Sequence, residues 1–259
     1  MEAERLAALD IVRVRAENPS IYTLTGTNSW VLARDPAWVI DPGPPDPAHL
    51  DALVEEIDAR GGLGGILLTH HHGDHAEAVP ALRARRSAPV AAAAGEEITL
   101  ADGDRLGPLR AVATPGHVPD HLAFVMPGAC FTGDAVLGEG SVFITGDLQG
   151  YLAALRRLLA EPLQVICPGH GPPVFSPHAK LEEYIEHRLE RERLLVRALD
   201  DGARTVDQML DRAWAEVSPP LRLAAAITLG AHLDKLEHEG RLPAGVERPT
   251  VTIPTNLPV

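Results

Sequence analysis

The chain has 259 residues, of which 45% are hydrophobic and 4% aromatic, and its formal net charge is −13. This apolar content suffices for one large domain and a small one, with a core built mainly of aliphatic side chains. The acidic balance argues against a polyanionic partner. The sequence shows no signal peptide pattern and no run of membrane-spanning length, so we expect a cytoplasmic protein without a membrane partner.

Short apolar runs bounded by turn residues predict strands, and longer amphipathic runs predict helices. Strands are expected at 11–15, 30–33, 38–41, 65–69, 89–94, 110–113, 122–126, 130–133 and 165–167. Helices are expected between them at 47–60, 74–86 and 148–160, each with its apolar residues on one face. This order predicts an α+β fold, in which two sheets pack face to face between outer layers of helices as a four-layer αββα sandwich.

The sequence changes character after residue 178. A long charged helix is expected at 180–200, and the stretch from Thr205 to Gln208 is typical of a capping box that begins another helix. Two further helices follow, interrupted by Ser218-Pro219-Pro220 and ending at Gly240. The last of them resembles the end of a winged-helix module.

These features predict three parts of the chain. A larger domain of strands and helices is expected at 1–178, a small helical, winged-helix-like domain at 179–245, and a proline-containing tail at 246–259. From Arg204 to Arg241 five basic residues stand against six acidic ones. A surface that reads phosphates should be basic, so this balance disfavours nucleic acid as the partner of the module.

The densest group of potential metal ligands follows the expected strand at 65–69. The segment Thr69-His70-His71-His72-Gly73-Asp74-His75 places four imidazoles and a carboxylate within six residues. A loop after a strand can direct several of these groups at one small volume, where imidazole nitrogens and carboxylate oxygens suit zinc. His71 is expected to point away if side chains alternate. A polar loop that is merely rich in histidine is the alternative.

Three more ligand-type residues, His117, Asp134 and His170, each lie in a glycine-containing turn after an apolar run. Small turn residues let the backbone come close to an ion without a clash. His121 opens the next strand and could donate a hydrogen bond to a substrate or to an oxygen at the metals, with a structural histidine as the alternative. Asp41 ends the strand at 38–41 and is expected to orient the ligand loop.

In this order the motifs resemble the metallo-β-lactamase superfamily pattern, H-x-H-x-D-H followed by separate His, Asp and His. The resemblance covers roughly residues 10 to 178 and implies two Zn²⁺ ions, although Mn²⁺ and Fe²⁺ suit the same donors. It assigns His70, His72 and His117 to one ion, Asp74, His75 and His170 to the other, and Asp134 to a bridging position. It also implies hydrolysis by a hydroxide held between the ions. We expect Asp74, Asp134 and His121 to be the catalytic residues.

Two residues separate this chain from other branches of the superfamily. Asp134 stands where β-lactamases of the commonest zinc class carry cysteine, and His72 stands where the oxygen-reducing di-iron members carry glutamate. Persulfide dioxygenases keep similar ligands around a single iron, so iron-dependent oxygen chemistry is a less favoured outcome. A non-catalytic binding protein is also less favoured, because every ligand position is filled.

A narrower resemblance extends over nearly the whole chain. The motifs Asn18-Pro19-Ser20, Leu24-Thr25-Gly26-Thr27-Asn28 and Tyr184-Ile185-Glu186-His187-Arg188, together with the segment 233–240, are similar to the β-lactamase-like protein 2 group. That group includes endoribonucleases that cut single-stranded RNA, and related fungal proteins are thioesterases that release polyketides from an acyl carrier. We therefore expect hydrolysis of an ester or thioester, small or carrier-linked, with a metal-dependent endoribonuclease acting on single-stranded RNA as the alternative.

Overall fold

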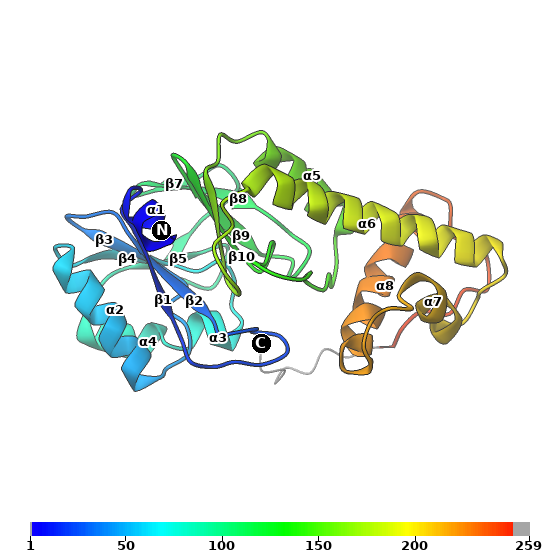
Figure 1. The fold of residues 1–259 in the computed structure, drawn as a ribbon, viewed down its shortest axis with the longest axis horizontal. Helices are drawn as coiled ribbons and strands as arrows, with labels where there is room; N and C mark the ends of the chain where they lie inside the picture. Colours follow the sequence, from blue (N-terminus) through cyan, green and yellow to red (C-terminus); the bar gives the residue numbers. More distant parts are fainter. Residues whose placement is uncertain (1, 251–259) are drawn as a thin grey trace.

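Two mixed β-sheets form the centre of the larger part of the molecule (Figure 1). The structure is a computed structural model that describes residues 2–250. The first sheet has the strand order β1 (Ile11–Arg15), β2 (Asn28–Leu32), β3 (Ala37–Ile40), β4 (Leu63–Leu67), β5 (Val90–Ala92) and β6 (Ile98–Thr99). The second has the order β11 (Val165–Pro168), β10 (Ala129–Gly133), β9 (Leu122–Met126), β8 (Leu109–Ala113) and β7 (Arg105–Leu106).

Side-chain alternation along the strands builds the layers. On β2, Trp30 and Leu32 belong to the apolar cluster between the two sheets, where Phe124 and Phe131 of the second sheet also lie. Val31, between them in sequence, belongs to a separate cluster on the outer face. Successive strand residues face opposite sides, so each sheet has one face on the other sheet and one under helices.

Helices cover both outer faces. α2 (Pro47–Ala59) and α4 (Val79–Arg85) supply apolar side chains to the outer cluster of the first sheet. α5 (Leu148–Leu159) and the beginning of α6 (Pro177–Asp200) do the same for the second sheet. The predicted αββα sandwich is thereby confirmed.

The helix predicted at 74–86 is wrong as a single element. The chain forms a single turn, α3 (Gly73–Ala76), and then a separate helix, α4. Pro80 lies in the first turn of α4, where its missing N–H costs no hydrogen bond, whereas it would remove one from a continuous helix. The short elements β6, β7 and α1 (Glu2–Ala7) were not predicted, because so few residues give no readable periodicity.

The last part of the described chain is helical and extends from one end of the sandwich (Figure 1). It contains α6, α7 (Val206–Ala213), the 3₁₀ turn η1 (Pro219–Leu221) and α8 (Arg222–His238). The predicted capping box is present, with the Thr205 hydroxyl and the Gln208 side chain each bonded to the other's backbone N–H. Between residues 2 and 250, no helix combines the length and the apolar character needed to cross a bilayer.

α6 packs on the sandwich and also supplies residues to the core of the helical part. The predicted domain boundary at 178/179 falls in its first turn, and this boundary stays a prediction. In the predicted tail, the Glu247 N–H donates to the Arg204 carbonyl over 2.8 Å, so residues 246–250 run along the helical domain. The rest of the tail, 251–259, lies outside the described residues.

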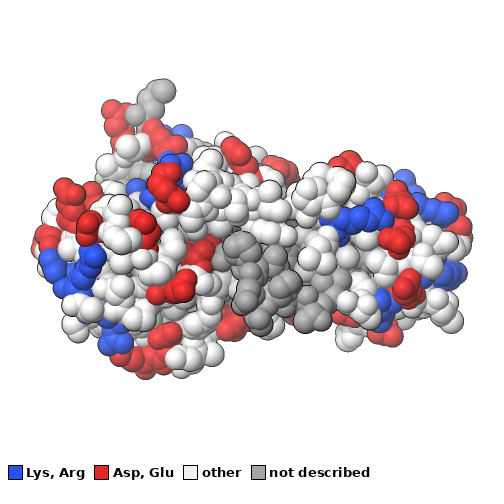
Figure 2. Space-filling model, turned by 90° about the horizontal axis from the view of Figure 1, so that it is seen from below, with Lys and Arg blue, Asp and Glu red and all other residues white. Residues whose placement is uncertain are grey.

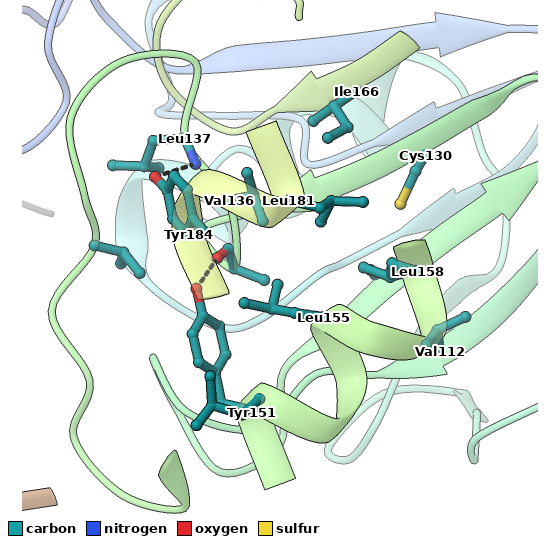
Figure 3. Close-up of a cluster of buried hydrophobic side chains, with 14 of the residues drawn as sticks. Val112, Cys130, Val136, Leu137, Tyr151, Leu155, Leu158, Ile166, Leu181 and Tyr184 are labelled. Carbon is teal, nitrogen blue, oxygen red and sulfur yellow. Dashed lines mark hydrogen bonds between the residues drawn. The ribbon is translucent and has the colours of Figure 1, made fainter. Parts of the chain in front are cut away.

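Two buried tyrosines fix the segment that follows β10. The Tyr184 hydroxyl of α6 accepts a hydrogen bond from the Leu137 N–H over 2.9 Å. The Tyr151 hydroxyl of α5 donates to the Ala135 carbonyl over 2.6 Å, as Figure 3 shows. Because Asp134 directly precedes this segment, helices of the outer layer hold the backbone that carries it.

We predict that Tyr184→Phe lowers the free energy of unfolding by about 1–3 kcal/mol, because it leaves the buried Leu137 N–H without an acceptor. Urea unfolding followed by circular dichroism measures this change. Tyr22→Phe is the control, since no hydrogen bond of the Tyr22 hydroxyl occurs within residues 2–250, and it should change stability by less than about 0.5 kcal/mol. Equal losses in both variants would contradict the role given to the Tyr184 hydroxyl.

Candidate metal centre

Strand topology brings the predicted ligand loops to one edge of the sandwich. In the second sheet β8 and β10 both run antiparallel to β9, and β11 runs parallel to β10, so the carboxyl ends of β8, β10 and β11 lie at the same edge. The loops to His117, Asp134 and His170 begin there. The His70–His75 loop follows β4 of the first sheet. The Leu122 N–H, at the start of β9, donates to the Thr69 carbonyl over 2.8 Å, and this bond joins the edges of the two sheets.

His70, His72 and His117 form the first group of converging donors. His72 Nδ1 lies 2.9 Å from His70 Nε2 and 3.0 Å from His117 Nε2. A ring nitrogen carries either one proton or one lone pair, so His72 Nδ1 cannot form good hydrogen bonds to both neighbours, whereas a cation placed among the three nitrogens accepts all three lone pairs. These atoms are close enough for the three residues to hold one metal ion.

Asp74, His75 and His170 form the second group. His75 Nε2 and His170 Nε2 are 3.3 Å apart, and Asp74 Oδ2 lies 3.4 Å and 3.2 Å from them. Tetrahedral zinc with bonds of about 2.0–2.1 Å needs ligand atoms separated by roughly 3.3 Å. The spacing of this group is therefore that of a metal site, and the three residues form a possible one.

The Asp134 carboxylate lies between the two groups. Its Oδ1 is 3.5 Å from His75 Nε2 and 3.4 Å from His170 Nε2, while its Oδ2 is 3.6 Å from His117 Nε2. Asp134 Oδ1 and Asp74 Oδ1 are buried and lack a hydrogen-bond partner among the described residues. Buried carboxylate oxygens of this kind need cations. The donor set thus fits two divalent ions, with Asp134 placed to touch both.

The two groups differ in their affinity for protons. Burial lowers the pKa of His117 to about 4 and that of His70 well below its ordinary value, so both rings are neutral at pH 7. At His170 burial acts in the same direction, but the carboxylate of Asp134 outweighs it and raises the pKa to about 9. The pKa of His75 is also raised against burial, by Asp74, Asp134 and Asp41.

Asp41 contacts His75 of the second group on the side of the ring away from the other candidate ligands. Its Oδ1 accepts from the Thr69 N–H over 2.8 Å, and its Oδ2 lies 2.9 Å from His75 Nδ1. A carboxylate in this place favours the tautomer of His75 with its proton on Nδ1, which leaves the Nε2 lone pair free for a metal ion. These contacts fit the orienting role predicted for Asp41. His71 points away from the ligands and faces Glu96, as predicted.

Sequence reasoning gave no role to Thr27 and Asn18, which orient Asp74. The Thr27 hydroxyl donates to Asp74 Oδ2 over 3.0 Å and accepts from the Asn18 amide over 3.0 Å. Both residues belong to the motifs that carry the narrower family resemblance. That resemblance was the available signal, because a contact between residues 27 and 74 leaves no trace in local periodicity.

Close packing at the centre requires Gly169. A Cβ at this position would lie 2.6 Å from Asp134 Oδ1 and 2.7 Å from His75 Cε1. Any larger residue would displace the ligands themselves. The glycine before His170 is therefore explained by the approach of backbone to ligands rather than by turn geometry alone.

His121, predicted as a catalytic residue, is buried behind the ligands. Its Nε2 accepts from the Asp134 N–H over 3.2 Å, and its Nδ1 lies 2.7 Å from the Thr114 hydroxyl. Burial lowers the pKa of His121 to about 3, so the ring is neutral and both nitrogens are engaged. These contacts fit the structural alternative, in which His121 positions the backbone of Asp134.

A pocket of about 270 Å³ opens beside the candidate ligands His117 and Asp134. It lies between the sandwich and the helical domain and is walled by the loops at 21–24 and 137–143 and by α6 and α8. Its apolar lining includes Tyr22, Phe143, Trp214, Val217 and Ala225. The sequence did not predict this pocket, because its walls come from segments far apart in the chain.

We predict that the two groups bind metal with different pH dependence. Without metal, the His75–His170 pair keeps at least one proton between pH 6 and 8, because the pKa of His170 is raised to about 9. That proton must leave when the ion binds, so the affinity of this group should rise about tenfold per pH unit. The His70–His72–His117 group should vary little over the same range. Zinc titration calorimetry at pH 6, 7 and 8 measures both, and two equal slopes would contradict the assignment.

We predict that Asp41→Asn weakens binding of one ion about 10–100-fold, because the amide no longer holds the His75 tautomer. Elemental analysis after dialysis against a weak chelator should then give about one ion per chain. His71→Ala is the matched control and should keep the metal content of the unmodified protein. Loss of an ion from the His71 variant would show that the wrong imidazoles had been assigned.

Comparison with known proteins places the chain in a family. The metallo-beta-lactamase superfamily model matches residues 22–110, and the beta-lactamase associated winged helix domain model matches residues 205–243. A beta-lactamase-like protein 2 homolog of Drosophila melanogaster is 32% identical over 90% of this chain and 89% of its own. A lactamase-like protein of Aspergillus niger is 32% identical over 73% of this chain and 64% of its own.

Solved structures agree with this result. A metallo-beta-lactamase family protein of Thermus thermophilus superposes with a TM-score of 0.66 at 25% identity, over 89% of this chain and 94% of that one. The fold and both resemblances predicted from the sequence are confirmed. The chain therefore belongs to the metallo-β-lactamase superfamily, in the group of β-lactamase-like protein 2 homologues, and is a metal-dependent hydrolase with a C-terminal winged helix domain.

Proposed function

We propose that this protein hydrolyses an ester or thioester whose acyl group is largely apolar, either small or linked to a carrier. The observation that carries the proposal is the pocket, because its apolar walls end at the metal ligands His117 and Asp134. Apolar lining with a few polar groups at one end is typical of sites for small organic ligands. An acyl chain in this pocket would place its carbonyl at the metal centre.

The residues of the chain would divide the work as follows. His70, His72 and His117 would hold one ion, Asp74, His75 and His170 would hold the other, and the Asp134 carboxylate would contact both. When bound, the two ions supply an activated water and a Lewis acid for the carbonyl oxygen. Asp41, Thr27 and His121 keep the ligands in place. The aromatic walls of the pocket exclude bulk water from the acyl group.

Zinc is the ion we propose for both positions. Imidazole and carboxylate donors at these separations suit tetrahedral zinc. Manganese and iron accept the same donors, so the metal content of the protein as isolated should be measured together with activity.

Charge distribution favours an acyl substrate over RNA. Two arginines of the helical domain are paired with acids: Arg222 with Asp207 and Asp211, and Arg248 with Asp234 and Glu237. Basic and acidic side chains are interspersed over the helical end of the face in Figure 2. RNA binding needs a basic surface that remains available to phosphates. This charge distribution makes a metal-dependent endoribonuclease the second candidate. The observation in its favour is the similarity to a β-lactamase-like protein 2 homolog over 90% of the chain.

We predict that the zinc-loaded protein hydrolyses thioesters in a panel of N-acetylcysteamine esters and does not cleave a short unstructured RNA. Released thiol is measured by a colorimetric reagent, and RNA cleavage by gel electrophoresis. RNA cleavage with an affinity that falls steeply with salt would overturn the proposal in favour of the nuclease. Asp134→Ala should lower metal content and turnover together, and full turnover with full metal occupancy would contradict the bridging role.

A further inference from the structure

Arg188, in the motif Tyr184–Arg188 of α6, lines the pocket but has no place in the proposed reaction so far. Its side chain is only 2% exposed. Within residues 2–250, no carboxylate forms an ion pair with it, although most other arginines of the described chain have one. A buried guanidinium without an anion is costly, because desolvation removes the hydration of the charge and nothing replaces it.

The contacts of Arg188 satisfy only part of its donors. One terminal nitrogen, Nη2, donates to the Ser141 hydroxyl over 2.8 Å and to the Val142 carbonyl. The guanidinium lies 5.9 Å from the ring centre of Tyr151. Its Nε is buried and has no hydrogen-bond partner among the described residues. All of these partners are neutral, so the positive charge itself is not balanced.

The other basic side chains at this wall differ from Arg188. Arg191 pairs with Glu216 and donates to the Ala213 carbonyl, so its charge is balanced. His187 lies 3.4 Å from the Ser141 hydroxyl and 3.3 Å from Arg191 Nε. Burial and the two neighbouring guanidinium groups lower the pKa of His187 to about 4, so this ring is neutral. Arg188 is therefore the cation of this wall that remains available.

Carboxylates that line the pocket do not neutralise it. Asp134 is committed to the metal centre, and Glu139 is exposed and forms no ion pair with Arg188. The pocket thus combines apolar walls with a cation at the helical side, in a protein whose net charge is −13. A ligand with an apolar body and an anionic end matches both features.

We propose that Arg188 is an anion-binding residue for the substrate, and that the substrate is a thioester or ester of a dicarboxylic acid. The thioester carbonyl lies at the metal centre, the methylene or aromatic body fills the apolar pocket, and the distal carboxylate binds the guanidinium of Arg188. Hydrolysis adds one water across the thioester bond and releases the free diacid and the thiol. This inference rests on the proposed function and names its substrate class.

The test compares pairs of thioesters that differ only at the far end. N-acetylcysteamine monothioesters of succinic, adipic and suberic acid are measured against the butanoyl, hexanoyl and octanoyl thioesters. For at least one chain length, kcat/KM should be about tenfold or more higher for the carboxylate, because a hydrogen bond between two charged groups stabilises the bound substrate by at least about that factor. Equal or higher kcat/KM for every neutral partner would overturn the inference.

Variants assign the preference to Arg188. In Arg188→Gln the ratio of kcat/KM between the carboxylate and neutral partners should fall to about one, whereas Arg188→Lys should retain part of it. Arg193→Gln is the matched control: it removes one positive charge from the exposed side of the same helix, where Arg193 pairs with Glu186 and Glu190, and should keep the ratio. An unchanged ratio in Arg188→Gln would overturn the assignment. If that variant does not fold, the wild-type ratio and the lysine variant decide.

A binding experiment separates this inference from the proposed function. Calorimetric titration of the zinc-loaded protein with hexanoate should give an affinity about tenfold or more weaker in Arg188→Gln than in the wild type or Arg193→Gln. If hexanoate binds in this pattern but no thioester is hydrolysed, the proposed function fails while the anion-binding role of Arg188 stands. Equal affinities in all three proteins mean that the carboxylate binds elsewhere, and the inference fails.

Discussion

The arrangement of the site depends on one electrostatic constraint: two buried carboxylates and five imidazoles are held within a few ångströms of each other with their lone pairs converging. Without cations this arrangement is unfavourable, because Asp74 and Asp134 each keep a buried oxygen that lacks a hydrogen-bond partner in the described chain. The fold offsets this cost through supporting contacts. Asp41, Thr27 and His121 each fix one ligand or its backbone, and none of them needs a metal to do so.

The helical domain contributes to the site from outside the sandwich. α6 holds the segment after Asp134 through Tyr184, and its next turn brings Arg188 to the wall of the pocket. α8 closes the opposite side with Ala225 and Thr228. The winged helix domain therefore forms part of the wall of the pocket beside the candidate metal centre.

Much of the metal centre could be predicted from the sequence, because its ligands lie in short motifs directly after strands. The alternation of side chains along an extended segment correctly predicted that His71 points away from the candidate ligands. Chain-distant contacts could not be predicted in this way: Thr27 meets Asp74 only because a loop of the first sheet crosses the edge of the sandwich. The burial of Arg188 could not be predicted either, since the charged residues of a helix such as α6 are normally expected to face solvent. The break between α3 and α4 shows that a helical apolar pattern does not guarantee one continuous helix.

Anomalous X-ray diffraction at the zinc absorption edge, from crystals of the zinc-loaded protein, tests the central claim most directly. The account predicts two peaks roughly 3.5–4 Å apart. One peak should lie among His70, His72 and His117, the other among Asp74, His75 and His170, with the Asp134 carboxylate between them. A single peak, or two peaks of which neither contacts Asp134, would contradict the account.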